Sequence, residues 1–141
     1  MIVGFGFTKL SAEKNKNVNG KIDISNNVSI KSIEEDNLSL GQEKQKVLKF
    51  IFEFTSKYEP EIGNMDFEGE VLFLAEPKQN KEILSMWKKD KKLPKEIMST
   101  ILNAVLTKCN IKAILLSQEI NLPPPVPLPA VQVEQTSDYI G

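Results

Sequence analysis

Residues 47–75 read VLKFIFEFTSKYEPEIGNMDFEGEVLFLA, and this stretch decides the fold. In its first half, aromatic residues recur at even positions, with lysine and glutamate mostly between them. The aromatic residues are Phe50, Phe52, Phe54 and Tyr58. Alternation with a period of two is typical of a strand that buries one face. Residues 59–64 contain proline, glycine and asparagine and therefore predict a hairpin turn into a second, antiparallel strand.

The second strand of this hairpin changes character along its length. One of its faces carries Met65, Phe67, Val71, Phe73 and Ala75, and the other carries Asp66, Glu68 and Glu70. Leu72 and Leu74 then take the place of acids on that second face. A strand that is apolar on both faces is usually covered on both. We therefore expect the outer side of the sheet to be partly covered by a partner subunit, by a proline-rich segment or by a ligand.

Two further strands precede the hairpin. Apolar residues alternate with glycine and threonine over residues 3–8, and with lysine, aspartate and serine over residues 22–31. The intervening residues 11–20 are rich in lysine and asparagine and end in Asn19-Gly20, a strong turn signal. Residues 34–46 are polar and include a glycine, which predicts a connection.

Helical periodicity begins after Glu76-Pro77. Ile83, Leu84 and Trp87 predict a short helix over about 80–89. A proline at position 94 fits the start of a longer helix that ends near residue 119, or breaks near residue 110. Its broad apolar stripe predicts contact with the sheet and with another helix or subunit. Four strands followed by two helices give a two-layer α+β domain with a four-stranded antiparallel sheet and a long C-terminal helix.

A proline-rich segment, residues 120–131, follows the long helix. Proline has no backbone N–H, so the segment cannot be helix or central strand and is expected to be polyproline II. It retains large apolar residues that a disordered linker rarely contains: Leu122, Val126, Leu128 and Val131. We predict a stiff strap that lies against the protein's own sheet or against a partner. Pro124 and Pro127 also form a P-x-x-P pattern that an external aromatic groove could bind.

The composition excludes several classes of chemistry. The chain of 141 residues has no histidine and no arginine, so all 18 basic residues are lysines. Histidine-based catalysis, common zinc sites and bidentate phosphate recognition are therefore absent. The single Cys109 reads as a small buried hydrophobe, and the lack of disulfides suits a cytoplasmic protein. A net charge of −1, no apolar run of about 18 residues and no signal peptide argue against nucleic-acid and membrane partners.

Two charged groups and one aromatic residue could have a functional role in addition to a structural one. Asp66, Glu68 and Glu70 could bind a hard cation or support acid–base chemistry, but a solvated strand face is the preferred interpretation. The lysines of residues 88–92 similarly indicate a solvated helix end. Trp87 could contact a client, although the edge of the core is the preferred place for it. We expect no catalysis, no cofactor and no metal.

The order of elements resembles the SecB-like chaperone fold. The resemblance is carried by residues 47–75 and by the block from Leu93-Pro94 to Leu128. In that family, a helix opened by proline is followed by a stretch of the Asn-Leu-x-Pro-Val kind, which Ile120-Asn121-Leu122-Pro123 and Pro125-Val126 match in part. We therefore predict one domain over 1–131, with the strap at 120–131, and a flexible tail over 132–141.

The resemblance implies an ATP-independent holding chaperone that binds unfolded polypeptides through apolar grooves and forms a dimer or tetramer. Its expected client- or partner-binding residues are Phe5, Phe7, Leu72, Leu74, Leu122, Val126 and Leu128. The near-neutral charge and the tail sequence differ from SecB proteins that deliver clients to the SecA motor, so SecA binding is not expected. One alternative is a non-catalytic adaptor or structural subunit for a specific folded partner. A small-molecule domain or enzyme that uses Asp66, Glu68 and lysines ranks last.

Overall fold

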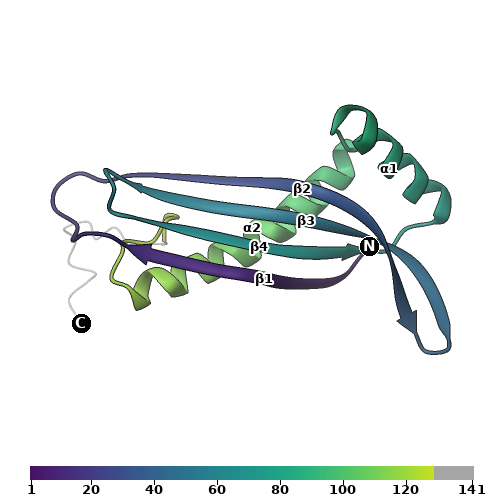
Figure 1. Cartoon of the computed structure of the whole chain (residues 1–141), viewed down its shortest axis with the longest axis horizontal. Coiled ribbons are helices and arrows are strands. Elements are labelled where there is room, and N and C mark those ends of the chain that lie inside the picture. Colours follow the sequence, from purple (N-terminus) through teal and green to yellow (C-terminus); the bar gives the residue numbers. More distant parts are fainter. Residues whose placement is uncertain (129–141) are drawn as a thin grey trace, which may run out of the picture.

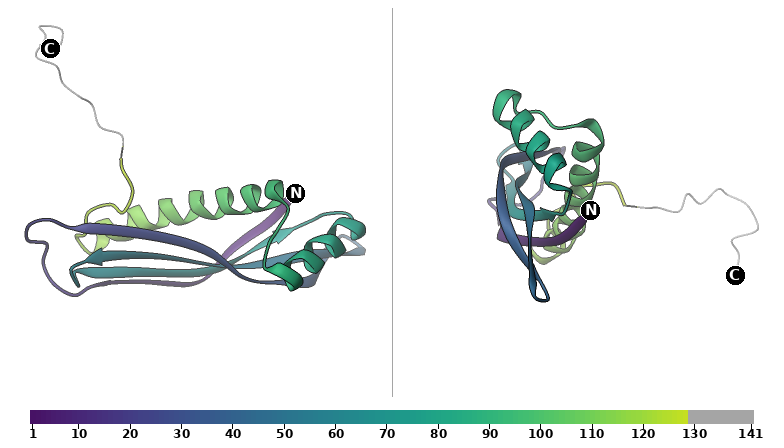
Figure 2. Two further views of the ribbon diagram at one scale, coloured as in Figure 1. Left: turned by 90° about the horizontal axis from the view of Figure 1, so that it is seen from above. Right: turned by 90° about the vertical axis from the view of Figure 1, so that its right-hand side faces the viewer.

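The computed structural model of the chain describes residues 1–128, with the side chain of Leu40 excepted. Four strands precede two helices: β1 (Ile2–Lys14), β2 (Asp23–Leu40), β3 (Glu43–Glu59), β4 (Gly63–Phe73), α1 (Pro77–Asp90) and α2 (Lys95–Glu119). The strands form one layer, and α2 lies along one face of that layer (Figures 1 and 2). The predicted α+β class is confirmed. Val131 and the predicted tail 132–141 lie outside the described residues.

The strands do not follow one another in space as they do in the chain. The sheet is four-stranded and antiparallel with the order β1-β4-β3-β2, so that β1 and β2 occupy opposite edges (Figure 1). The connection between them, residues 15–22, therefore crosses the end of the sheet. It is held there by the backbone N–H of Asn15, which donates to the carbonyl of Ile62 at 2.7 Å.

The prediction of a polar connection over residues 34–46 is wrong. β2 and β3 continue through this region as a two-stranded ribbon that turns at Gly41, whose φ of 67° is readily adopted by glycine. Its charged residues suit a ribbon that is solvated on both faces. They also form cross-strand ion pairs, from Lys46 to Glu35 at 3.8 Å and from Lys49 to Asp36 at 3.2 Å. Figure 1 shows this ribbon projecting past the ends of β1 and β4.

The hydrophobic core lies between the sheet and α2. Phe50, Phe52, Phe54 and Phe67 are fully buried, and Phe73 is nearly so, which confirms their predicted role in core packing. Gly69 makes this packing possible, because a Cβ atom there would overlap the Phe52 ring and the carbonyl oxygen of Gly6. The absence of a side chain at this position thus lets β1, β4 and the aromatic layer approach closely.

Every fourth residue of α2 faces the core. The buried residues are Ile97, Ile101, Val105, Cys109, Ala113 and Ser117. A repeat of four drifts by about 40° per step around a helix with 3.6 residues per turn. We attribute this drift to the twist of the sheet along which the helix lies. The helix is unbroken at Asn110, and Pro94 occupies the N-cap position, one residue before the predicted place.

The helix α1 packs at one end of this core. Ile83 is fully buried, and Trp87 is half-buried against the core, as predicted. The lysines within residues 88–92 are all exposed, which confirms the solvated helix end. The much longer α2 is, by length and composition alone, apolar enough to cross a membrane, a test that core helices also pass.

Candidate functional site: apolar surfaces beside the long helix

The strap lies on the protein's own sheet. The chain turns at Asn121, whose φ is 56°, and then crosses the sheet end on the face that α2 covers. The Tyr58 hydroxyl donates to the carbonyl of Pro123 at 2.7 Å, and the Asn26 side-chain amide donates to the carbonyl of Pro125 at 2.8 Å. Since Tyr58 and Asn26 belong to β3 and β2, the strap spans neighbouring strands. The strap was predicted to lie against the protein's own sheet or against a partner, and in the structure it lies against the protein's own sheet.

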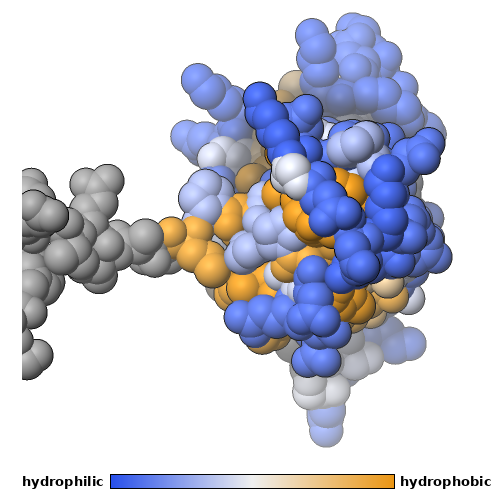
Figure 3. Space-filling view, turned by 90° about the vertical axis from the view of Figure 1, so that its left-hand side faces the viewer, coloured by the Kyte–Doolittle hydropathy of each residue, from blue (hydrophilic) through white to orange (hydrophobic). Residues whose placement is uncertain are grey.

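The three apolar strap residues that the structure describes have different environments. Leu122 is only 5% exposed and packs on Gly63, so its side chain belongs to the core rather than to an open surface. Val126 is half-buried, and Leu128 is 47% exposed. Figure 3 shows apolar surface around the point where the strap leaves the described part of the chain. Of these three predicted binding residues, Leu128 is the most accessible.

Tyr58 is a buried anchor for the strap. Burial raises the pKa of its phenol to about 12, so the hydroxyl remains protonated and can donate to Pro123 at neutral pH. Asn26, the second anchor, accepts a hydrogen bond from the Ser56 hydroxyl at 2.6 Å. Tyr58 and Ser56 are buried whereas Asn26 is exposed, so these hydrogen bonds hold the strap at the boundary between the core and solvent.

Phe5 and Phe7 lie on the helix-facing side of β1. Their rings meet edge to face with centroids 5.2 Å apart, and Phe5 stacks on Phe52 at 5.3 Å. The ammonium groups of Lys108 and Lys112 lie 5.9 Å from the centroids of Phe5 and Phe7 respectively. Both phenylalanines are half-buried. They extend the aromatic core toward β1, and lysine side chains from α2 cover this edge.

The opposite flank of α2 has a different cover, because its lysine comes from α1: the ammonium group of Lys91, the C-cap residue of α1, lies 5.2 Å from the centroid of the Trp87 ring. A cavity of about 220 Å³ opens between β2, the C-terminal part of α1 and the first half of α2. Its apolar lining, which we name the β2–α2 groove, consists of Val28, Ile30, Trp87, Met98 and Leu102. All five residues are half-buried. Among the described residues β2 pairs with β3 alone, so the groove runs beside the free edge of a strand.

A second apolar patch lies on the side of α2 that points away from the sheet. Ile111 and Leu115 are 55% and 52% exposed, and they are one helical turn apart. Half-buried Leu106 and Ile114 continue the neighbouring row, which begins with Met98 and Leu102. The broad stripe that predicted more than one contact surface therefore has one part buried on the sheet and another part open.

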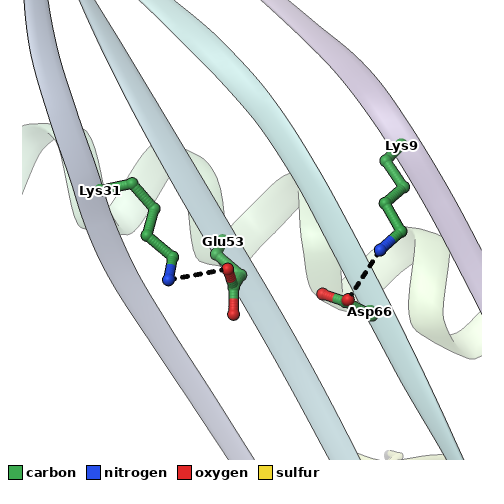
Figure 4. Close-up of polar contacts among 4 residues, drawn as sticks. All are labelled: Lys9, Lys31, Glu53 and Asp66. Atoms are coloured by element: carbon green, nitrogen blue, oxygen red, sulfur yellow. Dashed lines mark hydrogen bonds and ion pairs between the residues drawn. The ribbon is translucent and has the colours of Figure 1, made fainter.

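The sheet face opposite α2 is ionic. Lys9 pairs with Asp66 and Lys31 with Glu53, both at 3.0 Å (Figure 4). The hydrogen bond to Asp66 raises the pKa of Lys9. Carboxylate oxygens of Glu53, Asp66 and Glu68 gather within 4.8 Å of one another, and lysines already pair with two of the three, Glu53 and Asp66. The arrangement supports the interpretation of a solvated face stabilised by cross-strand pairs.

Leu72 and Leu74 lie on this outer face and are half-buried. Leu72 is close to Gly4, where an added Cβ would contact it. The backbone of Leu74 pairs with Met1 through bonds of 2.8 and 2.9 Å. The suggestion that the strap covers this face is wrong, because the strap lies on the other one. The client-binding role of both leucines stays a prediction.

The sequence did not identify the β2–α2 groove as a site. The periodicity placed Met98 and Leu102 on a helix stripe and Val28 and Ile30 on a strand, but it gave no strand order. The groove exists because β2 is an edge strand. The only available signal was the width of the apolar stripe, which exceeds what one sheet can cover.

The chain has the SecB-like fold: a four-stranded antiparallel sheet packed by a long C-terminal helix. The architecture matches that of the SecB-like chaperone Rv1957 of Mycobacterium tuberculosis, whose structure was solved in complex with a ChAD peptide from the Rv1956 HigA1 antitoxin. The TM-score is 0.62, the sequence identity is 11%, and the match covers 96% of this chain and 92% of that chain. No protein-family model and no curated protein sequence matches this chain. At this identity the likeness shows the fold.

Proposed function

We propose that the protein is an ATP-independent holding chaperone that binds unfolded polypeptides in the β2–α2 groove. The observation that carries the proposal is an apolar groove beside a free strand edge in a SecB-like fold. The complex of Rv1957 with a peptide from another protein supports the same kind of role. The protein acts by binding alone, since the side chains that line the groove are mainly apolar.

An unfolded chain presents the two features that this groove can bind. It exposes apolar side chains, and it has backbone groups without partners. The groove provides apolar contacts from Met98, Leu102 and Trp87, while β2 has an edge that can pair with an extended segment. Methionine adapts to differently shaped partners because its side chain is unbranched and flexible. Such a surface favours apolar sequences without strong preference for one of them.

Self-assembly is the second part of the proposal. Ile111 and Leu115 form an exposed apolar pair on a ridge whose first half carries polar Ser99, Asn103 and Thr107. A second copy that covers this pair would form a dimer, and a further interface would give a tetramer. The protein would work in the cytoplasm, where newly made chains are exposed to water and one buried thiol needs no oxidising environment.

The test is suppression of aggregation after dilution of two unrelated, chemically denatured clients, without nucleotide and at stoichiometric protein. The wild-type protein should suppress both. Met98→Glu with Leu102→Glu should abolish suppression, because two charges would enter the groove. Ser99→Glu with Asn103→Glu adds the same charge to the exposed ridge of the same helix and should retain suppression. A folded, soluble wild type that suppresses neither client would overturn the proposal.

The alternative is a non-catalytic adaptor for one specific folded partner. It is favoured by the fact that the neighbouring structure holds a peptide from one particular antitoxin. An adaptor would not suppress the aggregation of unrelated clients. Leu72→Glu with Leu74→Glu, on the outer face, would then weaken partner binding or assembly. If both sedimentation and partner binding are unchanged in this variant, that face has no such role.

A further inference from the structure

The sheet divides at the end of β4. The last residue pair between β3 and β4 joins Leu48 to Phe73. Beyond it, Leu74 remains beside β1 through two backbone hydrogen bonds with Met1, at 2.8 and 2.9 Å. β3, by contrast, extends back to Glu43 alongside β2 (Figure 1). The two central strands therefore separate, and a gap begins where β4 stops.

Residues 43–47 of β3 consequently have a strand partner on one side only. In the part of the chain that the structure describes, they pair with residues 36–40 of β2 and with no residue of β4. Neighbouring residues of a strand direct their N–H and C=O groups to opposite sides. Every second residue of this stretch thus turns its backbone groups toward the gap, where an added strand could bind them.

A cavity of about 550 Å³ lies in this gap. Lys44, Gln45 and Lys46 form one wall, and residues 74–77 form the other. Leu74 and Ala75 of the second wall are half-buried and apolar. A free strand edge beside an apolar wall has the two elements of strand addition, which are backbone hydrogen bonds for affinity and side-chain contacts for selectivity.

The charge around the gap favours an acidic occupant. Lys44 makes no ion pair within residues 1–128, and Lys46 makes only a loose pair with Glu35 at 3.8 Å. The helix α1 begins at Pro77 in the opposite wall, and its N-cap Glu76 makes no side-chain cap. The lining therefore sets two lysines and the positive end of a helix dipole against one carboxylate, that of Glu76 in the same wall. A second copy's identical edge would instead place lysines opposite lysines.

We propose that this gap binds a short, extended and acidic segment of another protein, which adds to the sheet as a strand antiparallel to β3. The segment occupies the position that β4 leaves beyond Phe73 and spans about five residues, as the free edge does. Its acidic side chains face Lys44 and Lys46, and its apolar side chains contact Leu74 and Ala75. This site is separate from the β2–α2 groove and does not depend on the holding function.

The test uses three fluorescein-labelled peptides and the intact protein, with binding followed by fluorescence anisotropy. The first alternates valine and glutamate, the second alternates valine and lysine, and the third is the first with N-methyl groups on alternate backbone amides. The acidic peptide should bind. The lysine peptide should bind about tenfold more weakly, and the N-methylated peptide should not bind, since it cannot donate along one edge.

Lys44→Glu with Lys46→Glu should reverse the preference between the two charged peptides. Lys88→Glu with Lys89→Glu, which makes the same charge change on exposed residues of α1, should leave the preference unchanged. Circular dichroism checks that each variant is folded. Equal binding of the N-methylated peptide, or no binding of any peptide, overturns the proposal. A change in the sedimentation of the unliganded Lys44→Glu, Lys46→Glu protein also overturns it, since the edge would then be covered by a second copy.

Discussion

Replacement of the strap leucines one at a time tests whether the strap is a structural element. Leu122→Ala removes a side chain that is 5% exposed and packs on Gly63. Leu128→Ala removes a side chain that is 47% exposed. If the strap is bound to the sheet end as the structure shows, these chemically identical truncations should have very different effects on the free energy of unfolding. Val126→Ala, at a half-buried position, should lie between them.

The size of each effect follows from burial. Truncation of a buried leucine to alanine costs about 2–5 kcal/mol, and a site near a chain end can partly collapse, so about 3 kcal/mol is expected for Leu122→Ala. The half-buried Val126→Ala should cost about 1 kcal/mol, because fewer methyl contacts are lost. Leu128→Ala should change stability by less than about 0.5 kcal/mol, as surface substitutions usually do.

Urea unfolding followed by circular dichroism measures these differences. With a denaturant dependence of about 2 kcal/mol per molar, the midpoint for Leu122→Ala should fall by about 1.5 M, and that for Leu128→Ala should remain within about 0.3 M of wild type. Under conditions where Leu122→Ala is folded, it should still suppress client aggregation, since its side chain does not line the groove. A Leu122→Ala midpoint equal to that of wild type would refute the structural role of the strap.

Four further predictions concern single residues. Gly69→Ala should destabilise the fold by several kcal/mol in urea, because its Cβ would overlap an aromatic ring and a carbonyl, whereas Gly6→Ala, with open space around the position, should be tolerated. Burial raises the pKa of Tyr58 to about 12 from its usual 10.0, so its contribution to stability is complete below pH 10.0 and is lost as the pH approaches 12. Unfolding curves of Tyr58→Phe against pH should lack that loss. Burial likewise raises the pKa of the Cys109 thiol to about 12, and alkylation at pH 8 should therefore be slow until urea unfolds the chain. Leu115→Glu should retain wild-type stability while lowering the sedimentation coefficient of any assembly; an assembly that persists unchanged would locate the interface elsewhere.

The sequence predicted local structure best where one face is apolar and the other polar. Residues 47–75 alternate so regularly that both strands, the turn between them and the buried aromatic set could be read directly. The helices were also predicted correctly in number and approximate extent, because their periodicity changes sharply after Pro77. In these segments the spacing of apolar residues a few positions apart already marks the face that is buried.

Features that depend on distant contacts could not be read in this way. Residues 34–46 have the polar sequence of a loop because both faces of the ribbon are solvated. The ion pairs within the ribbon join residues on different strands, so they become visible only once β2 and β3 are paired. The strand order has the same difficulty, since only tertiary pairing places β1 beside β4. Both candidate binding sites follow from that order. One lies at the free edge of β2, and the other lies where β3 extends past β4.

The pattern of α2 explains why the open groove lies on the β2 side of the molecule. Residues four apart share one side of the helix, so each side can be followed as a row. The row toward β1 contains Lys108 and Lys112, which cover Phe5 and Phe7. The row toward β2 begins with Met98 and Leu102, which are apolar and half-buried. If only packing against the sheet mattered, lysine stems could cover both flanks equally well. The difference between the two rows leaves an apolar groove beside the free edge of β2. Met98→Lys with Leu102→Lys gives the row toward β2 the lysines that the row toward β1 has, and this variant should therefore lose client binding while preserving the fold.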